Sequence, residues 1–388
     1  MKRNVFLHIA LLFLLSIACS LLRAQTMIPF AEGVEEKKEI KLSEVASDIR
    51  YIPLETTAES LLEQDILDIT FAGGYLFVSD YNKVLQFTPE GKFIRQIGKA
   101  GQGPGEYNQN ILAVAYDEAN KQIFLSDMRQ GKVLVYSFDG IFIKDIKTAI
   151  GAMSPYVDAG GNLFTVSNDY LRSKERKGDD LFVYSQNGKR LYGFPFHFEE
   201  GKNYPGLVFV PAILYPYNGN LFYKNPLEET VFRLDGKKKV PAYRLDLSRY
   251  EKLSAEEDKL LLDTKNKVGS ALSHEKKFYF YNLMETDKSM GVYYAQEDER
   301  RFAWYDKQTG KVCRVRSSQA DKDGFTDDRE GGCPVLPYFL RNGKLVGVVP
   351  ASVLLEKVKP ANAKGSLRNV LDHLLEDDNQ VIQVVTLK

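Results

Sequence analysis

Residues 73–97 read GGYLFVSDYNKVLQFTPEGKFIRQI. Two turns that contain glycine, at 73–74 and 90–91, separate apolar runs rich in Val, Leu, Ile and Phe, which favour β-strands. Glycine supplies the positive φ angles that tight hairpin turns require. Together with a similar run at 66–71, this stretch predicts a small antiparallel sheet of four strands.

The same order of runs and turns recurs at residues 111–146, 155–194 and 212–245. The second turn of each copy has its glycine at Gly91, Gly140, Gly188 and Gly236, with spacings of 49, 48 and 48 residues. Four short strands that repeat at this period are typical of a β-propeller blade. Helical repeats are excluded, because the runs are β-branched and aromatic and lack a helical period.

A fifth, looser copy covers residues 277–316. An insertion at 248–274 precedes this copy, and within it Ser254-Ala255-Glu256-Glu257 predicts the capping box of a short helix. We therefore expect a blade whose connection to its neighbour is long and partly helical.

The sixth copy begins at 335–350 and then changes into a predicted amphipathic helix. The apolar stripe of this helix consists of Leu367, Val370, Leu371, Leu374 and Leu375. A last strand is predicted at 381–387, which leaves this blade one strand short. Residues 49–54 (IRYIPL) can supply it, and Pro53, which has no N–H, suits an outer edge.

The sequence thus predicts an all-β fold, a six-bladed β-propeller of four-stranded antiparallel blades with short helical insertions. We expect the N- and C-terminal strands to close the ring in one blade, because closure removes open sheet edges. A ring of seven blades is the alternative, if the insertion at 248–274 contains strands.

The first 24 residues predict a signal peptide. Two basic residues, Lys2 and Arg3, precede an apolar run too short to span a bilayer, and Ala24 suits the cleavage site. Residues 25–388 are then the propeller domain, periplasmic or extracellular. The alternative is an outer-membrane lipoprotein that carries its lipid on Cys19. No second apolar stretch predicts a transmembrane segment in the mature chain.

Charge is balanced, with 52 basic and 52 acidic residues, so no nucleic-acid partner is predicted. We expect a monomer. In an oxidising compartment a disulfide between Cys313 and Cys333 is as compatible with the sequence as two free thiols.

Three stretches carry a resemblance to a known family: LSEVASDIRYIPLET at 42–56, IGKAGQGPGEY at 97–107 and DDREGGCP at 327–334. On these the chain resembles exported bacterial six-bladed β-propellers, which are TolB-like relatives of NHL-repeat propellers. The resemblance implies the fold and export. It implies little about activity, because propellers carry unrelated chemistries.

Two features of the sequence invite a ligand-binding interpretation. Residues 101–105 (GQGPG) suggest a phosphate loop, but Pro104 lacks an N–H and a strand follows, so we expect a tight crossing between blades. Asp80 and Asp127, with Asn168 and Asn225 in equivalent places, could form a ring of ligands. We favour Asx turns, since the residues recur blade after blade.

Acidic residues crowd one loop: Asp321, Asp323, Asp327, Asp328 and Glu330. Their spacing does not match an EF-hand, so we expect a solvated loop and predict no cofactor, with Ca²⁺ as the alternative. The mature chain has only His197, His274 and His373, and it lacks the H-E-x-x-H and G-x-S-x-G motifs. Catalysis by two carboxylates stays open.

The function predicted from these features is an exported, non-catalytic binding or scaffold propeller. It would engage a glycan, peptide or protein through the face that carries the longer loops. The candidate contacts are Tyr81, Tyr107, Arg129, Arg172, Asp327, Asp328 and Arg329. The alternative is a propeller hydrolase or lyase with a divalent cation on the central axis.

Overall fold

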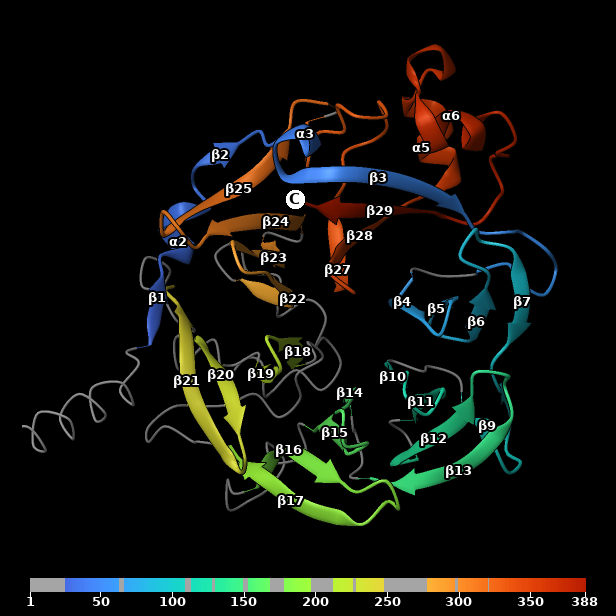
Figure 1. Ribbon diagram of the computed structural model, residues 1–388, viewed down its shortest axis with the longest axis vertical. Coiled ribbons are helices and arrows are strands. Elements are labelled where there is room, and N and C mark those ends of the chain that lie inside the picture. Colours follow the sequence, from blue (N-terminus) through green and yellow to red (C-terminus); the bar gives the residue numbers. More distant parts are fainter. Residues whose placement is uncertain are drawn as a thin grey trace, which may run out of the picture.

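A computed structural model describes residues 25–62, 66–108, 113–127, 130–148, 153–167, 178–196, 212–225, 228–247, 278–296, 299–319 and 321–388. Its strands form six small antiparallel sheets around a central axis, as Figure 1 shows. The predicted six-bladed β-propeller is therefore confirmed, and the alternative of seven blades is not needed.

The first three blades follow the predicted copies. Blade one contains β4 (Asp68–Ala72), β5 (Tyr75–Ser79), β6 (Val84–Phe87) and β7 (Phe93–Gln96). Blade two contains β10 (Val114–Asp117), β11 (Gln122–Asp127), β12 (Lys132–Ser137) and β13 (Phe142–Lys147). Blade three contains β14 (Met153–Val157), β15 (Leu163–Val166), β16 (Asp179–Tyr184) and β17 (Arg190–Pro195).

Blades four and five have the same order. Blade four contains β18 (Ile213–Tyr217), β19 (Asn220–Lys224), β20 (Thr230–Asp235) and β21 (Lys238–Leu245). Blade five contains β22 (Tyr279–Glu285), β23 (Ser289–Gln296), β24 (Glu299–Asp306) and β25 (Lys311–Ser317). The predicted helix start at 254–257 lies outside the described residues.

Blade six joins the two ends of the chain. It contains β27 (Pro337–Arg341), β28 (Lys344–Val349), β29 (Val381–Leu387) and β3 (Ala46–Pro53), in that order. β29 pairs antiparallel with β3, from Val381 opposite Pro53 to Leu387 opposite Ala46. The predicted closure is confirmed, with Pro53 on the outermost strand.

The first strand of each blade is the innermost one (Figure 1). Turns between strands one and two, and between strands three and four, therefore lie on one side of the ring, which we call the turn face. Connections between strands two and three and between blades lead to the opposite side, the loop face.

The recurring glycines lie at hairpin turns with positive φ, from 56° at Gly236 to 88° at Gly91. At Gly91 a side chain is also sterically excluded, since a Cβ would lie 2.1 Å from the carbonyl oxygen of Pro53. The turn of blade one thus packs directly on the strand that closes the ring.

Alternate residues of a strand pack against different neighbouring blades. Leu76 and Val78 of β5 belong to a buried cluster with Ile382 of blade six, whereas Phe77 packs with Tyr136 of blade two. Because successive side chains of a strand point to opposite faces of its sheet, a blade can bury one set against each of its two neighbours. These interfaces hold the blades around the axis.

The N-terminal segment crosses the outer edges of two blades before it enters blade six. β1 (Thr26–Ile28) pairs in parallel with β21, and β2 (Lys37–Lys38) pairs in parallel with β25. Short helices α2 (Phe30–Gly33) and α3 (Leu42–Val45) complete this strap. The strap was not predicted from the sequence, because such short parallel strands have no hydrophobic period.

Phe30 anchors the strap. Its side chain is fully buried, and its ring centroid lies 5.1–5.3 Å from those of Phe278, Phe280 and Tyr294. The strap is therefore part of the hydrophobic core between blades four and five.

The C-terminal helical segment contains α5 (Ala351–Lys357), the 3₁₀ helix η2 (Pro360–Asn362) and α6 (Gly365–Leu371). Four residues of the predicted stripe are buried, but Leu375 is 68% exposed, so this part of the prediction was wrong. The physical reason is that the helix ends at Leu371, and Leu375 no longer follows the helical period.

Cys313 and Cys333 are both free thiols, so the structure contains no disulfide between them. Burial raises the pKa of Cys333 to about 11.

None of the helices in the described part of the chain combines the length and apolar character that a membrane span requires.

Candidate functional site

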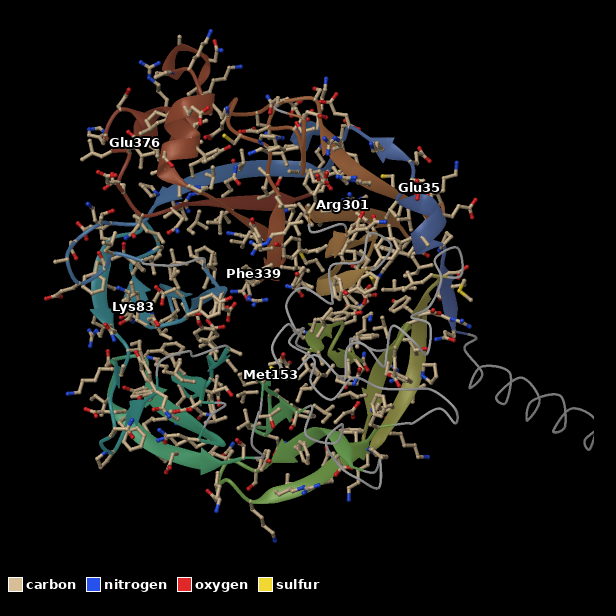
Figure 2. All side chains as sticks on the ribbon, turned by 180° about the vertical axis from the view of Figure 1, so that it is seen from behind. Glu35, Lys83, Met153, Arg301, Phe339 and Glu376 are labelled. Atoms are coloured by element: carbon tan, nitrogen blue, oxygen red, sulfur yellow. The ribbon has the colours of Figure 1, made fainter. Side chains whose placement is uncertain are left out.

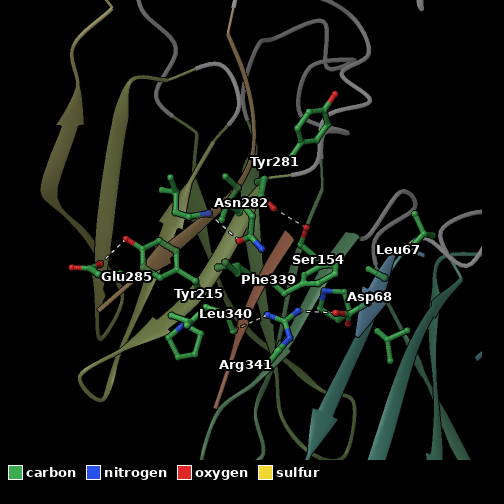
Figure 3. A pocket seen from close by; sticks show the side chains of 18 of the residues that line it. Leu67, Asp68, Ser154, Tyr215, Tyr281, Asn282, Glu285, Phe339, Leu340 and Arg341 are labelled. Carbon is green, nitrogen blue, oxygen red and sulfur yellow. Dashed lines mark hydrogen bonds and ion pairs between the residues drawn. The ribbon is translucent and has the colours of Figure 1, made fainter. Parts of the chain in front are cut away.

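A cavity of about 420 Å³ lies between the inner strands, and we call it the central cavity. All six blades contribute to its wall, among others through Asp68, Val114, Ser154, Tyr215, Asn282 and Phe339 (Figure 3). Figure 2 shows Phe339 beside the central opening, whereas Glu35 and Glu376 lie at the outer rim. The cavity falls in the size range of small-ligand pockets, roughly 300–1,000 Å³.

An ion pair across a blade interface forms one wall of the central cavity. Arg341, at the end of β27, donates from Nη2 to Asp68 Oδ1, 2.7 Å away, at the start of β4. Its Nε donates to the carbonyl of Ile69, so the side chain runs back along β4 from the turn face (Figure 3). The guanidinium also lies 5.0 Å from the ring centroid of Phe339.

Some N–H groups of Arg341 in this pair are not used by the described residues. A guanidinium has five N–H groups, and the described residues accept from three of those on Arg341, at Asp68, Ile69 and Leu340. The side chains of Arg341 and Asp68 are 31% and 10% exposed, respectively. The cavity wall thus presents N–H donors beside a carboxylate acceptor.

Another part of the cavity wall contains a second carboxylate, Glu285. Its Oε2 accepts a 2.9 Å hydrogen bond from the hydroxyl of Tyr215, and its Oε1 accepts from Tyr243. Lys307 Nζ lies 2.6 Å from Oε1 and neutralises the charge. Burial, and then the charge of Glu285, raises the pKa of Tyr215 well above its usual value. This tyrosine therefore stays a hydrogen-bond donor.

The net charge of the wall is small, since each carboxylate has a cation beside it. Asp68, Glu285 and Arg341 are the charged side chains among the described residues that line the cavity. Arg341 neutralises Asp68, and Lys307 neutralises Glu285.

Ser154 adds a strained backbone position to the cavity wall. It has φ +47° in β14, next to Pro155, where the register of the sheet shifts. Its hydroxyl donates a 2.7 Å hydrogen bond to the carbonyl of Ala212, which begins blade four. A left-handed residue other than glycine costs on the order of 1–3 kcal/mol, and such strain is concentrated at functional sites.

Two buried hydroxyl groups lie near Asp68. Ser79 is opposite Asp68 in the β4–β5 register, and its hydroxyl and that of Tyr116 have no hydrogen-bond partner in the described part of the chain. Burial, and then the charge of Asp68, raises the pKa of Tyr116 well above its usual value. Among the described residues, the surroundings of Asp68 thus hold polar groups that have no hydrogen-bond partner.

Tyr107, one of the predicted contacts, lies in the interior. It is fully buried, and its hydroxyl accepts a 3.2 Å hydrogen bond from Gln96. It belongs to β9 (Glu106–Tyr107), which pairs with β8 (Lys99–Ala100). Glu106 accepts from the N–H of Gly103, so the glycine-rich stretch wraps around its own carboxylate.

Asp327 is also fully buried. Its Oδ2 accepts from the hydroxyl of Tyr51 at 2.7 Å and from the N–H of Gly332 at 2.9 Å. Its Oδ1 accepts from the N–H groups of Arg329 and Glu330, both at 3.0 Å. Gly332 is required there, since a Cβ would lie 1.9 Å from the hydroxyl oxygen of Tyr51.

The neighbours of Asp327 make structural contacts as well. Asp328 accepts a 2.9 Å hydrogen bond from the N–H of Ser43, and Arg329 donates at 2.9 Å to the carbonyl of Ala46. Glu330 accepts from the N–H groups of Ser366 and Leu367 at the start of α6. The acidic stretch therefore fastens the strap and α6 to blade six. The solvated loop that we expected was wrong at Asp327 and also at Asp323, which is buried and pairs with Arg314.

The Asx turns are confirmed at two of the recurring positions. Asp80 Oδ1 accepts from the N–H groups of Asn82 and Lys83 at 2.7 and 2.8 Å, and Asp127 Oδ1 accepts from Gln130. Tyr81 lies in the first of these turns and is half-buried. Asn168, Arg129 and Arg172 lie outside the described residues.

Neither Tyr81, Tyr107 nor residues 327–329 line the central cavity. Whether any of them contacts a ligand elsewhere stays a prediction. Sequence reasoning missed Asp68 and Arg341. One signal was present, because both are polar residues in strands predicted to be the first, innermost strands of their blades, and these strands line the central axis. In the described part of the chain, no group of three or more His, Cys, Asp or Glu side chains is placed to hold a metal ion.

A second cavity, of about 470 Å³, lies outside the ring between β3 and α6. Several of its polar groups are already paired. Ser366 accepts from the N–H of Tyr51 and donates to Glu330, and Glu55 pairs with Lys92. The central cavity is thus the better candidate for a binding site.

A protein-family model described as a domain of unknown function, DUF4934, matches residues 25–386. No curated protein matches the chain. A solved structure from Bacteroides fragilis, provisionally described as an exported protein, is similar, with 20% identity and a TM-score of 0.72 over 94% of this chain and 100% of that one. A DUF4221 member from Bacteroides vulgatus has 8% identity and a TM-score of 0.50 over 89% and 97%. These likenesses show the fold alone.

Proposed function

The chain belongs to the DUF4934 family, a domain of unknown function, and we propose that it is a non-catalytic binding propeller with its ligand in the central cavity. The observation that carries the proposal is the Arg341–Asp68 pair, which keeps N–H donors on a wall built by all six blades. Strain at Ser154 supports the same place, as do two buried hydroxyl groups near Asp68 that have no partner among the described residues.

The state of the carboxylates supports binding rather than hydrolysis. Glycoside hydrolysis needs one carboxyl group held in its uncharged form beside a second carboxylate. Asp68 forms an ion pair with Arg341, and Glu285 forms one with Lys307, so each of these carboxyl groups is already held by a partner within the protein. The described residues offer no group of metal ligands for the alternative, a hydrolase or lyase with an axial cation.

We further propose that residues 1–24 direct export to the periplasm or the cell exterior. The exported description of the similar Bacteroides fragilis protein supports this. The finer relationship to TolB-like and NHL-repeat propellers, and the monomeric state, also remain proposals.

Thermal-shift titration with a set of neutral oligosaccharides and a set of dipeptides tests the site. A ligand present at 100 times its Kd stabilises the folded state by about 2.7 kcal/mol. We expect at least one probe to raise the Tm of the wild-type protein, and we expect Asp68→Asn to abolish the shift.

Asp139→Asn is the matched control, because Asp139 forms an exposed ion pair with Arg95 on an outer turn. This variant should respond like the wild type. A probe that stabilises Asp68→Asn and the wild type equally would place its site outside the central cavity and refute the proposal.

A further inference from the structure

We infer that the central cavity binds a neutral glycan, in which the hydroxyl groups of one sugar ring bond to Arg341 and Asp68. This inference rests on the proposed function and adds the chemical class of the ligand. Four properties of the cavity carry it: its charge, its donor and acceptor groups, its occupied backbone acceptors and its aromatic surfaces.

The charge of the cavity disfavours ionic ligands of either sign. A ligand carboxylate that reaches Arg341 lies beside Asp68, since the two side chains are 2.7 Å apart. A ligand ammonium that reaches Asp68 lies beside Arg341 for the same reason. Each would meet a like charge in a partly buried site, where water screens poorly. A neutral ligand has no such cost.

Arg341 and Asp68 also match the hydroxyl group in particular. The wall offers N–H donors next to carboxylate oxygens, and Ser154 adds a hydroxyl oxygen. A hydroxyl donates one hydrogen bond and accepts others. Two neighbouring hydroxyls of a sugar ring can therefore accept from Arg341 and donate to Asp68 at once.

A peptide could offer similar groups, but it would bind an inner strand through backbone hydrogen bonds. Side chains of the protein already occupy many of the carbonyls it would need. Arg341 donates to Ile69 and Leu340, and Asn342 donates to Phe71. Elsewhere Asn282 donates to Tyr338, and Ser154 donates to Ala212. The inner edges in blades one, four and six are thus poor templates for a strand.

Aromatic rings supply the apolar part of the site. Tyr281 lines the cavity and is 39% exposed, and the half-buried ring of Phe339 lies near Arg341. The negative face of an aromatic ring attracts the positively polarised C–H groups of a sugar ring. Figure 3 shows Tyr281 and the Arg341–Asp68 pair as separate parts of the cavity wall. We expect an oligosaccharide, one ring of which contacts Tyr281 while another bonds to Arg341 and Asp68.

Calorimetric titration of the full-length protein tests this class. The probes are the neutral disaccharides cellobiose, maltose, lactose and chitobiose (the N,N′-diacetyl form). Each is compared with a counterpart that carries a uronic acid, with one that carries a free amino sugar, and with dipeptides. We expect at least one neutral disaccharide to bind at least tenfold more tightly than both of its charged counterparts. Tyr281→Ala should weaken that binding severalfold, and Asp139→Asn should not change it.

Two charge-changing variants separate recognition from a loss of structure. Asp68→Asn leaves Arg341 unpaired and should shift preference toward the uronic acid. Arg341→Gln leaves Asp68 unpaired and should shift preference toward the amino sugar. A merely structural role would weaken all probes together and in both variants. If these two variants fold poorly, Tyr281→Ala still tests the inference, because the Tyr281 side chain is partly exposed and its removal should not unfold the protein.

Several outcomes overturn the glycan inference: no disaccharide binds, a charged sugar binds the wild type more tightly than its neutral form, or only dipeptides bind. If dipeptides bind and Asp68→Asn abolishes that binding, the proposed binding function stands and only the ligand class is wrong. If binding of every probe is insensitive to Asp68 and Tyr281, both proposals fail.

Discussion

The Tyr51 hydroxyl donates a 2.7 Å hydrogen bond to Asp327, a fully buried carboxylate 276 residues further along the chain. Tyr51 belongs to the outer strand of blade six, and Asp327 lies in the connection that leads into the same blade. The bond therefore links the start of the ring to its end. It also explains why a conspicuous acidic motif has a structural role.

Asp327→Asn should lower the free energy of unfolding by about 3 kcal/mol, because Asp327 accepts four hydrogen bonds and bonds to a charged group contribute about 1.5–3 kcal/mol each. Asp328→Asn, at an exposed hydrogen bond to Ser43, should cost less than about 1 kcal/mol. Urea unfolding compares the two. Equal losses would contradict the central role of Asp327.

Val385→Asp should prevent closure of the ring. Val385 is fully buried in β29, between β28 and β3, and an unpaired carboxylate there costs several kcal/mol. Thr386→Asp changes the next residue of the same strand, which is only partly buried, and should be tolerated. Circular dichroism during thermal unfolding distinguishes them. A cooperative transition at the wild-type Tm for Val385→Asp would refute the closure argument.

Alkaline pH should destabilise the protein through Tyr107. Burial raises the pKa of Tyr107 to about 12 in the folded state, against 10.0 when it is unperturbed. The folded state holds this proton more tightly, so the contribution is complete below pH 10 and falls as pH rises toward 12. The loss is on the order of 2–3 kcal/mol.

Tyr107→Phe should remove this part of the pH dependence. It should lower stability at neutral pH by about 1 kcal/mol, since the bond from Gln96 is lost. Urea unfolding at about pH 8 and about pH 11 provides the comparison. An identical pH dependence in wild type and variant would show that Tyr107 does not contribute.

Tyr116→Phe should leave the free energy of unfolding unchanged or raise it. The Tyr116 hydroxyl is buried and makes no hydrogen bond with the described residues, and such a group costs roughly 1–3 kcal/mol. Differential scanning calorimetry measures the change. A clear loss of stability would mean that the hydroxyl has a partner near Asp68.

Phe30→Ala should destabilise the protein by about 3–5 kcal/mol, because a large buried ring leaves a cavity between blades four and five. The control is Met27→Ala, three residues away. The Met27 side chain is 51% exposed, so this change should alter the free energy of unfolding by less than about 0.5 kcal/mol. Urea unfolding tests both. Similar small effects would show that the strap is not part of the core.

The sequence was sufficient to predict the ring because its turns are local signals. Gly91 and its equivalents mark hairpins whether or not the rest of the blade is known, and Pro53 marks an outer edge. The strap was not predicted, since β1 and β2 pair in parallel over only three and two residues. Leu375 was misplaced because an apolar pattern continues past the point where the helix ends.

The site was harder to predict than the fold for a physical reason. Conspicuous residues such as Tyr107 and Asp327 are buried: Tyr107 accepts a hydrogen bond from the side chain of Gln96, and Asp327 accepts from backbone N–H groups. Asp68 and Arg341 are single polar residues in ordinary strands, and their pairing depends on which blades become neighbours when the ring closes. A linear pattern does not contain that information.

The pairing of β3 with β29 sets the order of assembly. Ser47 and Thr386 bond to each other although they are 339 residues apart, so a chain that emerges from its N-terminus must wait for nearly its whole length before blade six can form. Contacts this distant form slowly, because the intervening loop must first be closed. Until then β3 lacks its partner strand, and the newly made chain exposes an unpaired strand edge at which other chains can pair and aggregate.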